Sequence, residues 1–266
     1  MIIKYGLITR FIFKKIMLWL TRPAGQAKKL TKLLEERGAK VFHLPLISIE
    51  ALPQDKKLEK KIKKLNQYDM AFFASTNAAR IGMELITTYF SELPKEIEYY
   101  TPGPVTANVL EDYGLKVVYP EKTMSTEALL ILPEIKKIIK NKNKKRAVVF
   151  RGVGGRELLA NSLREKGVEV DYIELYKRTL PEYKQSYLKD IVKTKKPDGI
   201  VFSSAEGIHN FMALFDKIYP DYKEVHVFVS SPRLEFIVKK IGFESVSSLK
   251  AADDNSIASG VLKPNG

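Results

Sequence analysis

The sequence has 266 residues, of which 45% are hydrophobic and 29% charged; this composition is typical of globular proteins, and the length suffices for about two ordinary domains. It contains no cysteine, and His43, His209 and His226 lack metal-ligand spacing, so disulfides, zinc–thiolate sites and thiol catalysis are excluded and no metal site is expected. The 45 basic residues outnumber the 31 acidic ones, and the formal charge of +14 indicates either an anionic partner or a surface of solvated lysines.

Residues 1–16 do not resemble a signal peptide, because lysines and an arginine interrupt the apolar core that such a segment needs. A strand begins abruptly at Met17, so we expect Met17 to be the native start and residues 1–16 to be an N-terminal extension. No apolar run approaches the roughly 18 residues of a membrane-spanning helix. We therefore expect a cytoplasmic protein without a membrane partner.

From Met17 onward, short apolar segments alternate with segments of helical periodicity. The first helix is expected to begin at Pro23, where a missing N–H costs nothing, and to end at Gly38. Strands alternating with single helices are typical of doubly wound parallel sheets, which bind ligands at the carboxyl ends of their strands. The expected strands are 17–20, 41–46, 70–74, 116–119, 147–150, 168–175, 199–202 and 225–229, with another at Val246, a connector at 47–53 and a helix at 125–132.

Runs of lysine carry much of the positive charge. The pairs Lys56–Lys57, Lys60–Lys61 and Lys63–Lys64 have helical spacing, and a further run at 136–146 lies just before an apolar strand. Such blocks are common on solvated helix faces, and this interpretation is favoured over an anionic ligand. No docking motif with interleaved aromatic residues accompanies them, so no nucleic-acid partner is expected.

An internal repeat falls on the ends of the predicted strands. Residues 69–75 (DMAFFAS) resemble residues 198–204 (DGIVFSS), and Arg22, after one apolar strand, matches Arg151 after another. Two similar α/β halves would place two sets of strand-end loops face to face across a cleft. Such clefts usually bind one sizeable ligand.

The repeat leaves the pairing of the segments open. Segments 17–50 and 146–175 are of one type, and segments 68–132 and 197–262 are of the other. Either each segment pairs with its neighbour in sequence, or the middle two form one domain and the outer two form another. The second arrangement requires the chain to cross between the domains twice, at the connector 47–53 and again just after residue 175.

Hydroxyl groups follow several predicted strands. Ser75, Thr76, Ser203 and Ser204 stand at the starts of predicted helices, where unpaired N–H groups and a partial positive charge bind carboxylate or phosphate oxygens. Each hydroxyl can also be a helix cap, worth about 1 kcal/mol. For any single loop the cap is the favoured interpretation, although one loop can serve both purposes.

The stretch 151–156 (RGVGGR) lies between a predicted strand and a predicted helix. It lacks the third glycine of a dinucleotide-binding fingerprint and the Lys-Ser/Thr end of a phosphate-binding P-loop. We interpret it as a turn in which the backbone at Gly152 and Gly154 approaches an anion. Arg22 and Arg151 hold equivalent places in the repeat and are candidate partners for carboxylates.

Tyr176 follows a predicted strand, beside Lys177 and Arg178. Its hydroxyl could donate a proton, although a tyrosine in such a place more often packs with its hydroxyl hydrogen-bonded. The sequence contains no legible Ser-His-Asp constellation and no nucleophile elbow. The residues alone therefore leave Tyr176 as a candidate proton donor, with packing as the favoured interpretation.

Taken together, these segments resemble the uroporphyrinogen-III synthase family. The resemblance runs from about Leu18 to Leu262 and rests on the order and spacing of several short stretches. These are LTRP at 20–23 with Gln26 and Gly38, LPLI at 44–47, FASTNA at 73–78, GPVTA at 103–107 with Gly114, RGVGGRELL at 151–159 and ELYKR at 174–178.

The resemblance implies two doubly wound parallel-sheet α/β domains joined by a two-strand connector: a discontinuous one of 17–47 and 180–262, and an inserted one of 52–174. It implies a cyclising lyase that converts linear hydroxymethylbilane, which carries eight carboxylates, to uroporphyrinogen III, with loss of water and inversion of ring D. It implies no cofactor or metal, and we expect a monomer. The alternative is a non-catalytic two-lobed protein that binds an anionic ligand.

The resemblance also implies which residues contact the substrate. The family positions carry over onto Ser75, Thr76, Thr106, Tyr176, Ser203 and Ser204. Tyr176 is the one expected to assist departure of the hydroxyl as a general acid. The second copy of the repeat departs from the pattern, because Leu234 stands where the first copy has Thr106.

Overall fold

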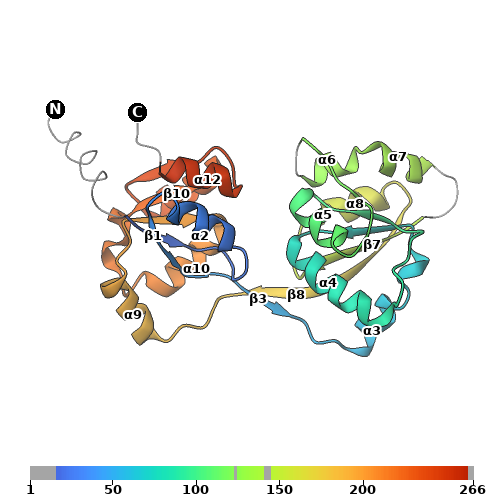
Figure 1. Cartoon of the computed structure of the whole chain (residues 1–266), viewed down its shortest axis with the longest axis horizontal. Coiled ribbons are helices and arrows are strands. Elements are labelled where there is room, and N and C mark those ends of the chain that lie inside the picture. Colours follow the sequence, from blue (N-terminus) through green and yellow to red (C-terminus); the bar gives the residue numbers. More distant parts are fainter. Residues whose placement is uncertain (1–15, 123–124, 141–144, 263–266) are drawn as a thin grey trace. The chain divides into compact units, whose positions relative to one another are not determined.

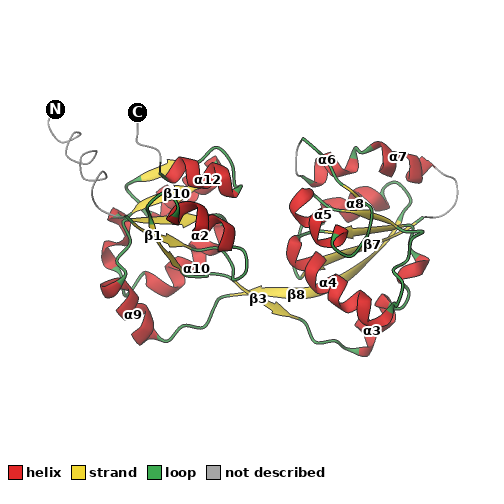
Figure 2. Ribbon diagram, in the orientation of Figure 1, coloured by secondary structure: helices red, strands yellow, loops and turns green. Residues whose placement is uncertain are grey.

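The computed structural model describes residues 16–122, 125–140 and 145–262. The chain divides into two compact units. Among the described residues, 16–49 and 179–262 belong to unit 1, and those between Glu50 and Arg178 form unit 2. Each unit is built on one sheet with helices packed against it (Figure 1, Figure 2). The predicted extension 1–16 lies, except for Ile16, outside the described residues and stays a prediction.

The sheet of unit 1 has five parallel strands in the order β11-β10-β9-β1-β2. Because both faces are covered, its central strands are continuous apolar runs. These strands are β1 (Met17–Leu20), β2 (Lys40–His43), β9 (Gly199–Phe202), β10 (His226–Val229) and β11 (Val246–Ser248). The helices are α2 (Lys28–Glu35), α9 (Gln185–Thr194), α10 (Ala205–Phe215), α11 (Pro232–Ile241) and α12 (Asp254–Val261), with a 3₁₀ turn, η2 (Pro220–Glu224).

Strand β1 shows why a central strand of this sheet must be apolar along its whole length. Successive side chains of a strand point to opposite faces. Trp19 packs among Phe211 and Phe215 of α10 on one face, while Leu18 and Leu20 pack against α2 and α12 on the other. All three strand side chains are fully buried, so β1 is the centre of two cores.

The sheet of unit 2 has six strands in the order β3-β8-β7-β4-β5-β6, and β4 to β8 pair in parallel. The chain crosses between the units within β3 and at the end of β8, where Lys177 forms a 2.9 Å ion pair with Glu50. The strands are β3 (Ser48–Ala51), β4 (Met70–Phe73), β5 (Glu98–Tyr100), β6 (Val117–Val118), β7 (Arg146–Gly152) and β8 (Glu169–Thr179). The helices are α3 (Lys56–Ile62), α4 (Thr76–Tyr89), α5 (Pro104–Glu111), α6 (Thr126–Leu130), α7 (Pro133–Lys140) and α8 (Leu158–Arg164), with a 3₁₀ turn, η1 (Leu65–Gln67).

The internal repeat is a structural repeat. In spatial order, β11-β10-β9-β1-β2 of unit 1 corresponds to β6-β5-β4-β7-β8 of unit 2. Strand β1 pairs with β2 and β9, and β4 pairs with β5 and β7, so the outer segments form one sheet and the middle segments the other. The predicted fold class, two doubly wound parallel-sheet domains of which one is discontinuous, is confirmed.

Some predicted element boundaries were wrong. The first helix begins at Lys28 rather than Pro23, because residues 22–27 form turns that include a left-handed Gly25 with φ of 80°. The predicted connector contains strand β3. The predicted helix 125–132 corresponds to α6 alone, which ends at Leu130, and a separate helix, α7, follows, because Pro133 has no N–H to continue the first helix and instead starts the second.

Candidate functional site

In unit 2, the candidate site lies at the carboxyl ends of β4 and β7. These strands are neighbours in the sheet, but the chain leaves β4 toward β5 on one side and β7 toward β8 on the other. Open α/β sheets bind ligands at such switch points. Ser75 follows β4 and caps α4, since its hydroxyl accepts a 3.1 Å hydrogen bond from Ala78 N–H.

Tyr176 is held against this edge by three contacts. Its hydroxyl lies 2.9 Å from Ser75 Oγ, and its carbonyl accepts a 2.8 Å hydrogen bond from Val153 N–H. The register of β7 and β8 shifts between Arg151 and Gly152, which sets Gly152 opposite Tyr176. A Cβ atom on Gly152 would lie 2.6 Å from the Tyr176 ring, so this position needs glycine for the ring to approach the backbone. Strand β8 extends through Tyr176, which the sequence placed just beyond a strand.

Arg151 belongs to a network within unit 2. Its guanidinium is buried, with 4% of the residue exposed, and forms a 2.8 Å ion pair with Glu157. The guanidinium also stacks on the ring of Tyr172 at 4.7 Å, and the Tyr172 hydroxyl donates to the other oxygen of Glu157. The hydrogen bond from Tyr172, with that from Arg151, holds the pKa of Glu157 below its ordinary value. Arg151 therefore already has a carboxylate partner in its own chain.

The glycines of the loop after β7 make room for these side chains. A Cβ on Gly155 would lie 2.6 Å from an Nη atom of Arg151, and Gly154 has a left-handed φ of 71°. The loop was predicted to bring its backbone toward an anion. The observed geometry gives Gly152 and Gly155 a further role, because they admit Tyr176 and Arg151.

These residues surround a cavity of about 230 Å³ within unit 2. Its walls combine apolar side chains from the sheet and from α6 and α8 with a few polar groups, which is the usual make-up of a ligand pocket. The polar groups include Ser75, Arg151, Tyr172 and Tyr176, and the apolar ones include Phe72, Leu129, Val149 and Leu159. Gly152 also lines the cavity.

Thr76 and Thr106 lie beside each other at the starts of α4 and α5. Their hydroxyl oxygens are 3.4 Å apart, and Thr106 is buried. Two of the predicted contact residues thus come together from neighbouring strand ends.

Unit 1 holds the equivalent edge, at the carboxyl ends of β9 and β1. Ser204 follows β9 and caps α10, accepting a 3.0 Å hydrogen bond from Gly207 N–H, and Ser203 precedes it. Arg22 follows β1 and forms an ion pair with Asp254 of α12. The Arg22 guanidinium also donates to the carbonyl of Ala252 at 2.8 Å.

The predicted site residues therefore fall into two groups. Ser75, Thr76, Thr106, Arg151, Gly152, Gly154 and Tyr176 lie in unit 2, and Arg22, Ser203 and Ser204 lie in unit 1. Their roles in ligand binding and catalysis stay predictions. Sequence reasoning missed Glu157 and Tyr172 as partners of Arg151; the only signal was that Glu157 closes the stretch RGVGGRE.

Comparison with known proteins gives a consistent result. The family model described as "Uroporphyrinogen-III synthase HemD" matches residues 28–258. The chain belongs to the uroporphyrinogen-III synthase family. The predicted family is confirmed, and with it the class of cyclising lyases.

Two uroporphyrinogen-III synthases illustrate how similar the relatives are. The protein from Escherichia coli is 27% identical over 241 residues, which cover 90% of this chain and 96% of that protein. The protein from Proteus mirabilis is 35% identical over 165 residues, which cover 62% of this chain and 81% of that protein.

Solved uroporphyrinogen III synthases share the fold. The structure of a mutant from Thermus thermophilus aligns with a TM-score of 0.58 at 17% identity and covers 93% of this chain and 98% of that one. The structure from Helicobacter pylori aligns with a TM-score of 0.59 at 16% identity, with the same coverage of both chains. At such low identity these matches establish the fold alone.

The described residues contain neither a metal-binding cluster nor a membrane-spanning helix. Within 16–122, 125–140 and 145–262, no three His, Asp or Glu side chains gather in a group that could hold a metal ion. In the same ranges, no helix is long and apolar enough to cross a membrane.

Proposed function

We propose that this chain cyclises linear hydroxymethylbilane to uroporphyrinogen III, with loss of water and inversion of ring D. The observation that carries the proposal is the family match over residues 28–258. The charge of the chain also supports it, since a formal charge of +14 attracts an octa-anion. The non-catalytic alternative is not favoured, because the curated relatives that cover most of the chain are named as synthases.

We propose that Tyr176 helps the hydroxyl leave, and its contact with Ser75 supports this role. Ser75 Oγ already accepts a hydrogen bond from Ala78 N–H, so its own proton can be donated to the Tyr176 oxygen, 2.9 Å away. The phenolic proton is then available to the substrate. The positive end of the α4 dipole favours the phenolate that develops as this proton moves.

The reaction proceeds by breaking the bond between the hydroxymethyl carbon and its oxygen. The oxygen takes the proton of Tyr176 and leaves as water, and the remaining pyrrole becomes a cationic azafulvene. The substituted carbon of ring D attacks it to give a spiro intermediate, which rearranges and closes the ring. The proton released as the last pyrrole regains aromaticity restores Tyr176. Most of the catalysis is orientation of four flexible rings.

The decisive experiment is the isomer produced from hydroxymethylbilane. Spontaneous cyclisation gives the type I isomer, so enzymatic formation of the type III isomer supports the proposal. Formation of type I alone, with tight binding of the product, would favour the non-catalytic alternative.

The role of Tyr176 is tested by Tyr176→Phe, which keeps the ring and removes the proton donor. General acid catalysis is typically worth about 100-fold or more, but this substrate cyclises unaided, so we expect a partial loss of kcat that exceeds about threefold. The matched control is Tyr99→Phe, which removes a buried hydroxyl that donates to Pro94 O at 2.8 Å, outside the cavity lining. Activity of Tyr176→Phe within about threefold of wild type, or equal to that of the control, would demote Tyr176 to a packing residue.

We further propose that the enzyme works as a monomer in the cytoplasm and without a cofactor. The family resemblance supports this part of the proposal. Light scattering should give the mass of one chain, and exhaustive dialysis against a chelator should leave turnover unchanged. A dimer mass, or activity restored by a metal ion, would overturn it.

A further inference from the structure

Helix α3 of unit 2 contributes no residue to the lining of the cavity at the candidate site and carries an unusual arrangement of charge. Within 56–64, six of the nine residues are lysine and one is acidic. Lysines three and four residues apart face one another on a helix and repel, and lysines in the first turn also oppose the helix dipole. The intrinsic electrostatics of α3 are therefore unfavourable.

The acidic groups of the helix offset only part of this repulsion. Asp55 is the N-cap, accepting a hydrogen bond from Leu58 N–H at 2.7 Å, and Glu59 pairs with Lys63 at 2.6 Å. Lys61 donates to the carbonyl of Tyr172 at 2.7 Å. Among the described residues, the other four lysines of this segment form no ion pair and are exposed: Lys56, Lys57, Lys60 and Lys64.

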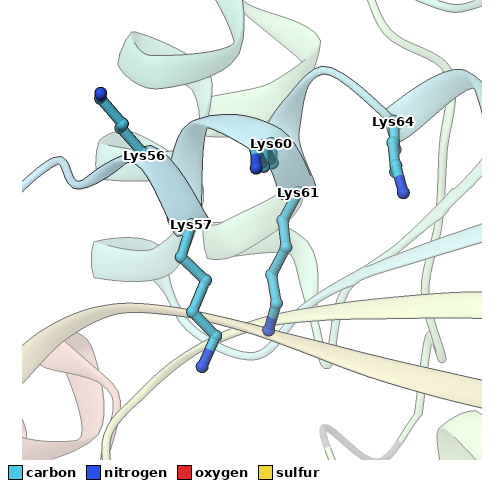
Figure 3. Close-up of a pocket in the computed structure, with 5 residues that line it drawn as sticks. All are labelled: Lys56, Lys57, Lys60, Lys61 and Lys64. Atoms are coloured by element: carbon cyan, nitrogen blue, oxygen red, sulfur yellow. The ribbon is translucent and has the colours of Figure 1, made fainter.

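Together with Lys61, these four side chains line a hollow of about 410 Å³. Figure 3 shows Lys57, Lys61 and Lys64 extending to the same side of the helix. The hollow is lined by lysine alone, without the arginine forks or aromatic rings with which proteins read nucleic acids.

We infer that this lysine-lined hollow is a second binding site for the carboxylates of the tetrapyrrole, separate from the catalytic cavity, where it captures the octa-anion and raises the rate of productive encounter. The inference rests on the proposed function, which supplies a ligand whose negative charge matches the unpaired ammonium groups. A cluster of one sign of charge in a concave surface raises local counter-ion concentration and association rates by about 10- to 1000-fold. Bound carboxylates also relieve the lysine repulsion along α3.

The test compares two variants that each remove four positive charges. In the first, Lys56, Lys57, Lys60 and Lys64 become glutamine, which keeps helix propensity nearly unchanged. In the matched control, exposed lysines on α7 and α9 become glutamine: Lys136, Lys137, Lys189 and Lys193. Lys61 is retained because it donates a hydrogen bond to the carbonyl of Tyr172 in β8.

We expect the α3 variant to lower kcat/KM about tenfold at low salt with kcat unchanged, and the control variant to change it less than about twofold. The difference should vanish near 1 M salt, where the screening length is about 3 Å. Equal losses in the two variants would show that only net charge matters and would overturn the inference. A loss confined to kcat would overturn it as well.

A binding measurement separates this inference from the proposed function. Uroporphyrin III, with eight carboxylates, should bind the wild type at two sites and the α3 variant at one, while coproporphyrin III, with four, should bind the hollow more weakly. If the wild type lacks synthase activity but binds uroporphyrin III through α3, the proposed function is refuted and the inferred binding site in the hollow still stands. The inferred site is refuted if the wild type and the α3 variant give identical uroporphyrin III titrations. It is also refuted if α3 is needed only for binding of a DNA duplex.

Discussion

Replacement of Gly152 by alanine should displace the hydroxyl of Tyr176. The added methyl carbon would lie 2.6 Å from Cε2 of Tyr176 and 2.7 Å from Cζ, whereas ordinary contacts begin at 3.4 Å. The ring must therefore move by roughly 0.8 Å, a shift that takes its hydroxyl out of good geometry with Ser75 Oγ, now 2.9 Å away. Overpacking and the lost hydrogen bond together should lower the free energy of unfolding by about 1–3 kcal/mol.

The same displacement should lower activity. A misplacement of about 1 Å at a reacting group can cost about 100-fold, so we expect kcat of Gly152→Ala to fall at least as far as that of Tyr176→Phe. The assays are thermal unfolding and single-turnover formation of the type III isomer. Gly167→Ala is the control, since Gly167 has a φ of 81° with open space around its Cβ position. It should lose about 1 kcal/mol of stability through backbone strain with kcat unchanged.

A second background decides whether the effect passes through Tyr176. In Tyr176→Ala the ring is absent, so the stability cost of adding Gly152→Ala should largely disappear. An equal stability cost in both backgrounds, or a Gly152→Ala variant with wild-type stability and kcat, would refute the reasoning.

Three further outcomes are expected. Ser75→Ala and Ser204→Ala remove equivalent helix caps and should each cost about 1 kcal/mol of unfolding free energy with only a modest loss of activity; a loss above about 100-fold in turnover assays would contradict a binding interface spread over many residues. Tyr219→Phe removes a buried hydroxyl that has no hydrogen-bond partner among the described residues, so denaturant unfolding should show a gain of about 1 kcal/mol, and a loss of that size would contradict the assignment. Burial lowers the pKa of His226, so its neutral form supports stability that is fully present above the unfolded pKa of about 6.5 and is lost as pH falls through the lower folded-state pKa. The stability difference between wild type and His226→Gln should shrink accordingly on acidification, and a difference that is constant from about pH 7.5 to 5 would speak against this.

The central strands could be predicted because burial on both faces leaves no choice of residue. Residues 70–74 and 199–202 are apolar runs followed by serine, and each contains a strand with all four residues buried. The start of the first helix was wrongly predicted at Pro23, because proline is common both in the first turn of a helix and in a turn outside helices. The sequence pattern does not distinguish these two uses.

The contacts within the site could not be predicted in the same way. Ser75 and Tyr176 were each proposed from their own strand ends, but they are 101 positions apart, and the contact depends on the register shift in β7. Likewise, Arg22 was expected to await a ligand carboxylate, yet it pairs with Asp254, 232 positions away. Only the folded sheet order shows which side chains meet.

The discontinuity of unit 1 has a consequence for the order of folding during synthesis. Its central strand β1 is paired with β9, and Thr21 donates to Val201 O across a separation of 180 residues. Leu18, Trp19 and Leu20 can pair with β2 early, but they lack β9, and Trp19 lacks the cover of α10, until most of the chain has left the ribosome. Nearly all of unit 2, in contrast, lies between Glu50 and Arg178 and can fold as soon as that stretch has emerged.

Once unit 2 has folded, it reduces the conformational entropy that unit 1 must lose when its two segments come together. Near the two ends of unit 2, Lys177 Nζ lies 2.9 Å from Glu50 Oε2. For unit 1, the long insertion is therefore equivalent to a short loop. Since the cost of closing a loop grows with its length, folding of unit 2 lowers the barrier for unit 1. Destabilising substitutions in unit 2 should then slow the maturation of a sheet to which they contribute no residue.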